Sequence, residues 1–372
     1  MNIILTRYLY FLDECLYSLL FAFINKNQST FKEVSFWIGE IFYSGFENEL
    51  WEYLWKIYYD FYAIKYPKYE KKINNLSKKI KCSEDDKFEN IMYVANLLYY
   101  SNVNYNVFVS RMINIRFPNY IYKKTNIDYI QNMNISMSKN EIFFIRSLHD
   151  KRMQNILFYI DKINVNRCYI LIKAYFKKNY NYNFKTKELE SINYKNKKHI
   201  IIAFIHHMWI DESEIQKKCI FKRPNIKIIS HEKKFNKKEI TPLFQTLNHK
   251  RLYKISPFVG AFSLSRYKQD FYKDILRLYW DYFVYECPLW KKRIDKYHGK
   301  LVKNKCELYF QNDDEFDGFY EEFNYEPDEQ SKSVQDMSIC DIDKNDGISW
   351  LNNILQNGKY IWAQSKGFKN NY

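Results

Sequence analysis

The sequence predicts an all-α fold, and three observations lead to this class. Hydrophobic residues make up 47% of the 372 residues and aromatic residues 19%, which is ample material for a packed core. The chain has only 8 Gly and 7 Pro; helices tolerate few of either, whereas a β-rich chain of this length needs more turn residues. Apolar residues also recur at helical spacing over most of the first 115 positions. A chain of this length can hold two or three domains.

A sixteen-residue pattern occurs twice, at 58–73 and at 279–294. The identical positions are Tyr58/Tyr279, Asp60/Asp281, Pro67/Pro288, Lys71/Lys292 and Ile73/Ile294. Proline is excluded from a helix interior but suits the first turn of a helix, so each copy is expected to form a corner between two helices. The repeat predicts two related multi-helical lobes, with Asp60, Pro67, Asp281 and Pro288 as structural corner residues.

Breaks in the apolar periodicity divide the chain into expected elements. The first lobe, 1–117, is expected to contain helices at 3–25, 29–44, 47–65, 68–80, 85–101 and 104–115. An Asn- and Tyr-rich linker follows at 118–137. The second lobe, 138–310, is expected to contain helices at 139–160, 166–178, 187–209, 266–286 and 288–304, interrupted by a Lys-rich, less regular insertion at 185–256 with a small hairpin near 226–230.

The N-terminal stretch 2–24 is strongly apolar, but charged residues interrupt it. A membrane-spanning helix rarely carries three charges, and the small-residue site of a cleavable signal is missing. Because Arg7, Glu14 and Ser18 fall on one face at helical spacing, we expect a buried amphipathic helix here rather than a membrane anchor. Membrane association of the chain is therefore not expected.

The C-terminal segment, 311–372, differs in charge from the rest of the chain. Residues 311–346 hold thirteen acidic residues and two lysines, whereas the whole chain carries a net charge of +15. Such an acidic run is typical of a solvated or disordered segment. Its aromatic residues, Phe316, Phe319 and Tyr320 among them, would also allow it to dock on a basic surface. Residues 348–362 regain helical apolar spacing and predict a short C-terminal helix.

Cysteine spacing and the missing nucleotide motifs limit the chemistry. The seven cysteines are scattered, with none closer than 19 residues to the next, so we expect neither a structural zinc site nor disulfides, and the set suits a reducing compartment. The sequence contains no P-loop, GxGxxG, GxSxG or kinase signature. We expect no cofactor and lean against an enzyme.

Two groups of residues allow a sharper interpretation. Asp60 and Asp281 each follow a base by four residues, Lys56 and Arg277. An intrahelical ion pair is the simpler interpretation, and a joint metal or substrate site is the alternative.

His199 and His206 share a helix face near several carboxylates, which leaves open a metal-dependent, nuclease-like enzyme. Histidines near a helix C-terminus are the simpler reading of that second group.

The positive charge has two explanations. The bases are 47 Lys and only 11 Arg, and Lys, Asn, Ile, Tyr and Phe all have A/T-rich codons, so a biased genome accounts for the excess as well as function does. Within 185–251, however, bases alternate with aromatic residues, a mixture that suits phosphate contact with base stacking. The candidate nucleic-acid contacts are Lys197, Lys198, Lys217, Lys218, Lys222, Arg223, Lys233, Lys234, Lys237 and Lys238.

Four stretches of sequence resemble a known group of proteins. These are 36–45 (FWIGEIFYSG), 55–62 (WKIYYDFY), 257–262 (PFVGAF) and 326–330 (EPDEQ). They are similar to a family of uncharacterised proteins of large nucleocytoplasmic DNA viruses, mimivirus-like giant viruses in particular, and the resemblance spans most of the chain. It implies an A/T-rich viral genome and a place in the host cytoplasm, in the virus factory, or in the virion. It carries no catalytic residue to this chain.

Together these observations predict a non-enzymatic structural or interaction protein of a large DNA virus. Its helices would form a scaffold in the cytoplasmic virus factory or the virion, with viral or host proteins as partners. The alternative is a nucleic-acid-associated replication or transcription factor that uses 185–251, gated by the acidic tail. In that case the tail would compete with nucleic acid for the same basic surface.

Overall fold

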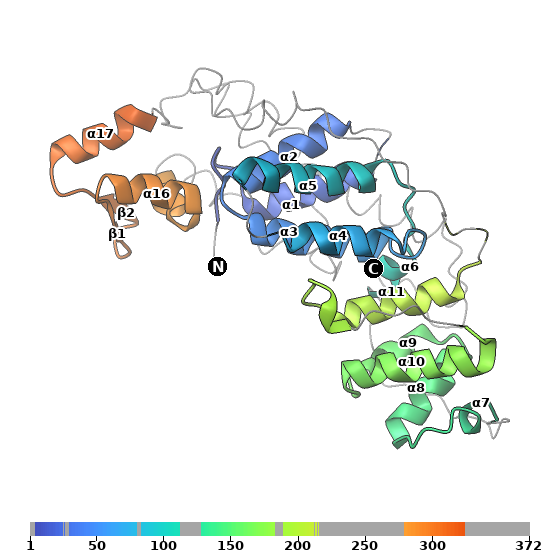
Figure 1. Cartoon of the computed structure of the whole chain (residues 1–372). Coiled ribbons are helices and arrows are strands. Elements are labelled where there is room, and N and C mark those ends of the chain that lie inside the picture. The colour runs from blue at the N-terminus through green and yellow to red at the C-terminus, as the bar shows by residue number, and fades with distance from the viewer. Residues whose placement is uncertain are drawn as a thin grey trace, which may run out of the picture. The chain divides into compact units, whose positions relative to one another are not determined.

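The computed structural model describes residues 4–24, 26, 30–79, 83–111, 128–182, 189–211, 213, 215 and 279–323. Most of these residues are helical, and they contain one small β-sheet of two strands. The prediction of a mostly helical protein is therefore confirmed for the described part of the chain (Figure 1).

The described residues fall into two compact units, each built from separate stretches of sequence. Unit 1 contains the described residues of 1–54, 79–101 and 220–353. Unit 2 contains those of 55–78 and 102–219. Helix α3, Glu47–Phe61, contributes its first part to unit 1 and its last part to unit 2. The predicted lobes and their boundaries stay predictions.

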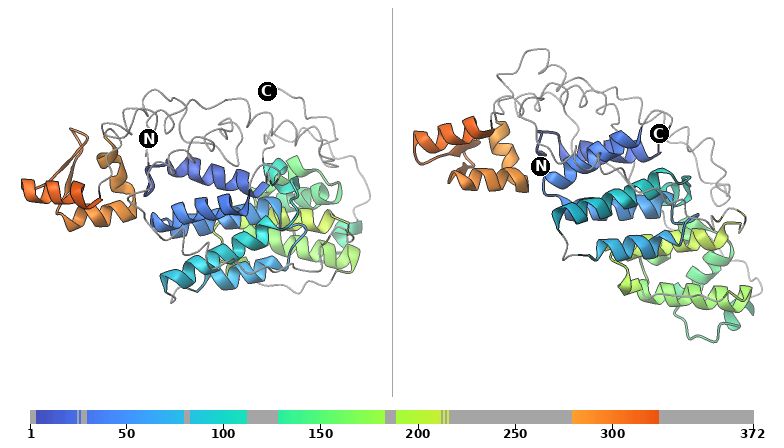
Figure 2. Two further views of the ribbon diagram at one scale, coloured as in Figure 1. Left: turned by 90° about the horizontal axis from the view of Figure 1, so that it is seen from above. Right: turned by 45° about the horizontal axis from the view of Figure 1, so that its top comes forward.

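Unit 1 is built on a group of packed helices. They are α1 (Leu12–Ile24), α2 (Phe31–Tyr43), the start of α3 and α5 (Glu84–Tyr99). Helix α1 packs on α2, and both contact α5; Figures 1 and 2 show these three helices side by side. Their shared core includes the fully buried side chains of Trp37 and Phe88. Ser83 begins α5 as expected, since its hydroxyl accepts a hydrogen bond from the Asp86 amide at 3.2 Å.

The chain before α1 is a tight loop, which corrects the expected helix at 3–25. Helix α1 begins at Leu12, and an isolated bridge joins Leu5 to Phe11. Leu9, at the turn of this loop, has a φ of 61°, a conformation that a continuous helix does not contain. Arg7 therefore does not share a helical face with Glu14 and Ser18.

The last part of unit 1 combines short helices with a hairpin. Its elements are α15 (Trp280–Phe283), the 3-10 turn η3 (Val284–Glu286), α16 (Pro288–Lys296), β1 (Lys300–Val302), β2 (Glu307–Tyr309) and α17 (Asp313–Phe323). The expected helix 288–304 is therefore too long. It ends at Lys296, and an antiparallel hairpin follows in which Leu301 pairs with Leu308. His298, with a φ of 55°, lies between α16 and β1, and Cys306, with a φ of 57°, lies in the turn between β1 and β2.

The start of the acidic segment is a folded helix. Helix α17 places Phe319 in the core, where it is fully buried. Its ring lies 5.3 Å from that of Phe310 and 6.3 Å from that of Trp290, measured between ring centroids. The aromatic residues thus pack this helix within unit 1, and the expected docking of the acidic segment on a basic surface stays a prediction.

Unit 2 is helical in all its described elements. After the end of α3 these are α4 (Tyr69–Ser77), α6 (Asn106–Arg111), α7 (Asp128–Gln131), α8 (Lys139–His149), α9 (Met153–Ile160), α10 (Val165–Tyr180), the 3-10 turn η1 (Leu189–Ser191) and α11 (Lys197–Trp209). Helix α10 packs against α7, α8 and α11, and α11 against α6.

Two expected helices of unit 2 are divided or shortened. The segment 139–160 splits into α8 and α9 at Lys151, which has a φ of 53°. Helix α8 begins with a capping box between Ser138 and Glu141. The expected helix 187–209 begins only at Lys197, where the Asn196 side chain accepts a hydrogen bond from the His199 amide at 3.1 Å. The expected hairpin near 226–230 lies outside the described residues.

The two copies of the repeat form related corners. Pro288 lies in the first turn of α16, and Pro67 lies two residues before α4 begins. The positions after each proline are buried alike: Tyr69 and Trp290 correspond, as do Ile73 and Ile294. The repeated pattern therefore specifies the apolar face of the second helix in each corner.

Candidate functional site

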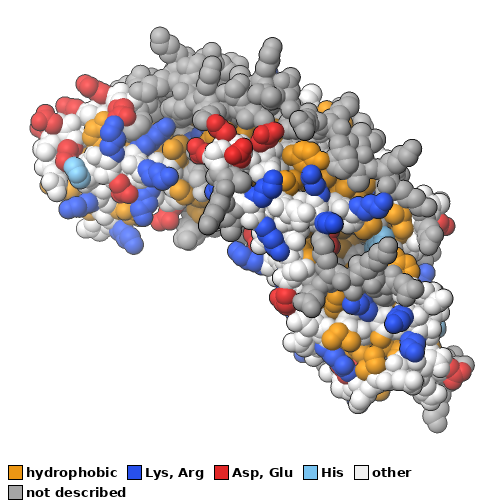
Figure 3. Space-filling view, in the orientation of Figure 1, with side chains coloured by type: hydrophobic (Ala, Val, Ile, Leu, Met, Phe, Trp, Pro, Cys, Tyr) orange, Lys and Arg blue, Asp and Glu red, His pale blue; other side chains and the backbone are white. Residues whose placement is uncertain are grey.

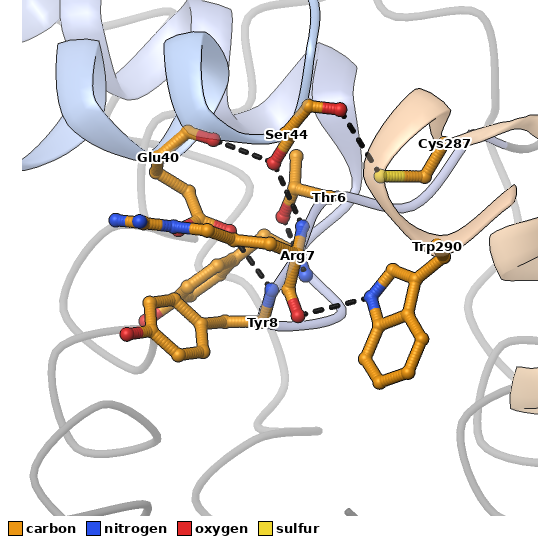
Figure 4. Close-up of polar contacts among 8 residues, drawn as sticks. Thr6, Arg7, Tyr8, Glu40, Ser44, Cys287 and Trp290 are labelled. Atoms are coloured by element: carbon orange, nitrogen blue, oxygen red, sulfur yellow. Dashed lines mark hydrogen bonds and ion pairs between the residues drawn. The ribbon is translucent and has the colours of Figure 1, made fainter. Parts of the chain in front are cut away.

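A buried polar cluster surrounds Arg7 in unit 1 (Figure 4). The Arg7 guanidinium donates from Nε to Glu40 Oε2 at 2.8 Å, and the Tyr8 amide donates to Glu40 Oε1 at 3.0 Å. The Arg7 amide donates to the Ser44 hydroxyl at 2.7 Å, which in turn donates to the Glu40 carbonyl at 2.6 Å. Arg7 is 2% exposed and Glu40 is fully buried. Both carboxylate oxygens of Glu40 are therefore used inside the protein, which offsets the cost of burying its charge.

The same cluster holds the 279–323 segment to the start of the chain. The Trp290 indole donates to the Arg7 carbonyl at 3.1 Å. The Ser44 carbonyl accepts from the Leu289 amide at 3.2 Å and from the Cys287 thiol at 3.4 Å. Figure 4 shows how Cys287 and Trp290 of the later segment face Ser44 and Arg7 of the earlier one. Contacts across more than 240 residues of sequence thus close unit 1.

Gly45 allows the close approach at this junction. Its φ is +95°, which residues with a side chain rarely adopt. A Cβ atom at Gly45 would lie 2.6 Å from Pro288 Cβ. Pro288, the corner proline of the second copy of the repeat, therefore packs directly on Gly45, which follows the end of α2.

A second buried cluster, in unit 2, surrounds Asp60. The carboxylate is fully buried, and Arg111 Nη1 donates to both of its oxygens, at 2.7 and 2.6 Å. His199 Nε2 lies 2.8 Å from Asp60 Oδ1. Burial alone would raise the pKa of Asp60, but the charge of Arg111 and the hydrogen bonds from Arg111 and His199 outweigh it and lower that pKa to about 2. Asp60 is therefore ionised at neutral pH.

Three helices supply this cluster. Asp60 comes from α3, Arg111 from the end of α6 and His199 from α11. Lys56, the base expected to pair with Asp60 along α3, also lies in the field of this cluster; burial first, and then Arg111, lower its pKa to about 8. Arg111 thus gives Asp60 a tertiary ion-pair partner that the sequence-based expectation of an intrahelical pair did not include.

His199 is engaged at both ring nitrogens. Its Nδ1 lies 2.9 Å from the Tyr194 hydroxyl, opposite the Asp60 contact at Nε2. Burial lowers the pKa of His199 more than Asp60 raises it, so the ring is neutral at pH 7. His206 is also buried, and burial lowers its pKa to about 3. Across the described residues, no group of three or more His, Cys, Asp and Glu side chains is arranged to hold a metal ion.

Asp281, the repeat partner of Asp60, has a different environment. Its Oδ2 accepts from the Tyr320 hydroxyl at 3.2 Å, and its Oδ1 accepts from the Tyr282 amide at 2.8 Å. Burial raises its pKa above the usual value. Arg277 lies outside the described residues. The two aspartates thus occupy equivalent positions of the repeat, but the pKa of Asp60 is lowered and that of Asp281 is raised.

Two of the ten candidate nucleic-acid contacts lie in the described part of the chain. Lys197 donates to the Ile192 carbonyl at 2.7 Å, and Lys198 donates to Asp161 at 2.6 Å. Both side chains therefore have partners within unit 2. The other eight, Lys217, Lys218, Lys222, Arg223, Lys233, Lys234, Lys237 and Lys238, lie outside the described residues.

Charge is distributed unequally between the two units. The described residues of unit 2 include 19 basic and 8 acidic side chains, a formal charge of +11. Those of unit 1 include 12 basic and 21 acidic side chains, a formal charge of −9. Over the full sequence of each unit the formal charges are +18 for unit 2 and −3 for unit 1. Over the helices of unit 2 in Figure 3, Lys and Arg side chains outnumber acidic ones and alternate with hydrophobic ones. The charge of a continuous stretch of sequence does not show this difference between the units, because each unit consists of stretches that are separated in the sequence.

Comparison with protein-family models, curated proteins and solved structures found no match. None of the helices in the described residues is long and apolar enough to cross a membrane. The buried clusters were largely missed by sequence reasoning, because Arg7, Glu40 and Arg111 carry no local signal for partners so distant in sequence. The repeat did single out Asp60, and the apolar helix did single out His199.

Proposed function

We propose that this chain is a non-enzymatic interaction protein of a large DNA virus, a helical scaffold that acts in the cytoplasmic virus factory or the virion. The resemblance of its sequence supports the viral setting. Viral or host proteins are the proposed partners. The buried clusters support the scaffold role, since Arg7 with Glu40 and Asp60 with Arg111 form internal ion pairs that fix distant parts of the chain.

The observation that carries this proposal is the separation of charge between the two units. Over the full sequence of each unit, both units hold 29 basic residues, but unit 1 holds 32 acidic residues and unit 2 only 11. The formal charges are therefore −3 for unit 1 and +18 for unit 2, and the difference comes from where the acidic residues lie. Surfaces of opposite sign favour different partners and speed their association.

Affinity purification of the tagged full-length protein from infected cells tests the proposal. One variant would remove exposed acids of unit 1, with Asp313→Asn, Asp317→Asn and Glu321→Gln on α17. A second would remove exposed bases of unit 2, with Lys71→Gln, Lys72→Gln and Lys177→Gln. We expect each variant to lose a different, defined set of partners. Identical partner sets for all proteins, or a hydrolase or transferase turnover in the purified protein, would contradict the proposal.

A second function, association with nucleic acid, is favoured by the +11 charge of unit 2. In this version the basic region 185–251 contributes, and the acidic tail competes for the same surface. The competition is tested by deleting the acidic tail, and the structure shows where the deletion should begin. Removing 311–346 would delete the folded helix α17 and its buried Phe319, whereas removing 324–346 spares both.

The shorter deletion still removes seven acidic residues and two lysines. We expect it to tighten binding to a labelled oligonucleotide and to make that binding more dependent on salt. Equal affinity before and after the deletion would exclude the competition while leaving nucleic-acid binding itself intact.

A further inference from the structure

Helix α17 presents an acidic face to solvent. Asp313, Asp317 and Glu321 follow one another at intervals of four residues, so they lie along one side of the helix and form an acidic stripe. All three residues are exposed, and Figure 3 shows acidic side chains gathered over this helix. Phe316 lies beside the stripe and is 47% exposed. The outer face of α17 thus combines a row of negative charges with an open aromatic ring.

The inner side of α17 fixes the orientation of this face. Phe319 is fully buried there, and the Tyr320 hydroxyl donates to Asp281 Oδ2 at 3.2 Å. The exposed ring of Phe316 lies 4.7 Å from the ring of Tyr320, measured between centroids. A partner would therefore meet a surface that is already ordered, which lowers the entropy cost of binding.

Other acidic residues of α17 are paired within unit 1, whereas those of the acidic stripe are not. Glu315 Oε1 lies 2.8 Å from His298 Nδ1, and Glu322 Oε2 accepts from Lys296 at 2.5 Å. Among the residues that the structure describes, no base forms an ion pair with any of the three acids of the stripe. The bases that follow α16 thus serve other carboxylates, and the charge of the stripe faces solvent.

The acidic stripe is unfavourable for the helix that carries it. Like charges four residues apart repel each other and destabilise a helix. Asp313 lies in the first turn, where the positive end of the helix dipole compensates its charge. Asp317 and Glu321 lie beyond that turn and gain no such compensation. Their charges therefore suit a positively charged partner rather than the stability of α17 itself.

We propose that the acidic stripe and Phe316 bind a Lys- and Arg-rich segment of a protein partner. The cationic groups of that segment pair with the carboxylates of the stripe, and one of them lies over the Phe316 ring in a cation–π contact. The same negative charges repel phosphate, so nucleic acids and anionic membranes do not suit this face. The inference rests on the interaction function proposed first and names the class of partner that unit 1 takes.

Fluorescence anisotropy of a labelled octalysine peptide with the full-length protein tests this site. The first variant is Asp313→Asn/Asp317→Asn/Glu321→Gln, which neutralises the acidic stripe. Each exposed ion pair contributes about 1.4- to 5-fold in affinity, so this variant should bind the peptide about 3- to 150-fold more weakly than the wild-type protein. Saturable binding by the wild-type protein at about 50 mM salt should also weaken as salt rises, because exposed charges are screened.

A control variant carries the same change of charge elsewhere in unit 1. It is Glu49→Gln/Glu84→Gln/Glu89→Gln, which removes three exposed acids from α3 and α5. We expect it to bind octalysine like the wild-type protein. Equal weakening in both variants would mean that the peptide responds only to net charge, and this would contradict the inference. No saturable binding by the wild-type protein would contradict it too.

The second residue to test is Phe316. Phe316→Leu keeps an apolar side chain but removes the ring, so it should weaken peptide binding by about 2- to 5-fold. Phe316→Trp should bind at least as tightly as the wild-type protein, because the indole is the best ring for a cation–π contact. Circular dichroism melting confirms that each variant is folded; if Phe316→Leu is not, the stripe variant and Phe316→Trp still decide the matter. Equal affinity of Phe316→Leu and wild type would contradict the role of the ring.

Self-association and purification from infected cells separate this inference from its alternatives. Self-association of the wild-type chain in sedimentation velocity, lost in the stripe variant, would make a second copy the occupant and contradict the inference. Partners recovered from infected cells that depend on the bases of unit 2, with peptide binding that does not depend on the stripe, contradict the inference alone. No protein partner of the wild-type chain contradicts the proposed function, and with it the inference.

Discussion

The ion pair between Asp60 and Arg111 gives the sharpest prediction for stability. Asp60→Asn leaves the Arg111 guanidinium facing a neutral amide in a site where Asp60 is fully buried. Breaking one member of a buried pair costs about 3–5 kcal/mol, because the remaining charge is uncompensated. We expect the free energy of unfolding to fall by about that amount at pH 7.

The pKa of Asp60 provides an independent estimate. It is about 2 in the folded protein against an ordinary value of 3.8, a difference on the order of 2 kcal/mol. Because the folded pKa is the lower one, this stabilisation is present above pH 4 and is lost as the pH falls from about 4 to 2. The lowered pKa of His199 acts in the same direction at higher pH, with loss beginning below about pH 6.5.

Urea unfolding followed by circular dichroism, repeated between pH 2 and pH 7, measures both effects. The repeat supplies a matched control: Asp281→Asn changes the equivalent aspartate, whose pKa is raised by burial, and should cost about 1 kcal/mol or less. A double-mutant cycle with Arg111→Met isolates the pair. A loss below about 1 kcal/mol for Asp60→Asn, or equal losses for the two aspartates, would refute the reasoning.

Three further predictions concern packing and helix ends. Gly45→Ala should lower the free energy of unfolding by about 2–5 kcal/mol in urea titrations, since it combines a positive φ with a Cβ contact of 2.6 Å to Pro288; an unchanged midpoint would contradict this. Trp290→Ala removes a fully buried ring and the hydrogen bond to the Arg7 carbonyl, at a cost of about 3–5 kcal/mol. Hydrogen exchange should then speed up in 279–323, and protection equal to that of wild type would count against the junction. Ser138→Ala removes the capping box of α8 and should cost about 1 kcal/mol by thermal unfolding, against no loss for Ser136→Ala.

Local signals in the sequence predicted the helices well but not where they stop. The prediction of Ser83 as a helix start was confirmed because the cap is made within four residues. The predicted ends of helices were wrong where a residue other than glycine has a positive φ, as at Lys151 and His298. Such conformations are imposed by packing rather than by residue type, so no local pattern announces them.

Long-range polar pairing explains what the sequence could not show. Arg7 looked like one polar residue of an amphipathic helix, but Glu40 supplies its partner from α2 and the loop forms instead. Arg111 lies 51 residues after Asp60, and His199 follows 88 residues later. The sequence analysis singled out Asp60 because this residue is identical in the two copies of the repeat. Its partners Arg111 and His199 lie outside the repeat, so the repeat gave no indication of them.

The difference in charge between the two units was also not visible in the sequence, because it too depends on which distant stretches fold together. Each unit gathers stretches that are far apart in sequence, so a running charge profile mixes them. Only the folded units show that the surface of unit 2 is basic independently of the region 185–251.

Ultraviolet cross-linking of the full-length protein to an oligonucleotide containing 4-thiothymidine tests most directly whether the positive charge of unit 2 serves nucleic-acid binding or, as proposed first, the binding of protein partners. Mass spectrometry of the digested complex then locates the cross-linked residues. We predict cross-links in unit 2 and their loss as salt rises from about 50 to 300 mM. Cross-links confined to unit 1, or a yield no higher than that of a denatured control, would contradict this nucleic-acid function.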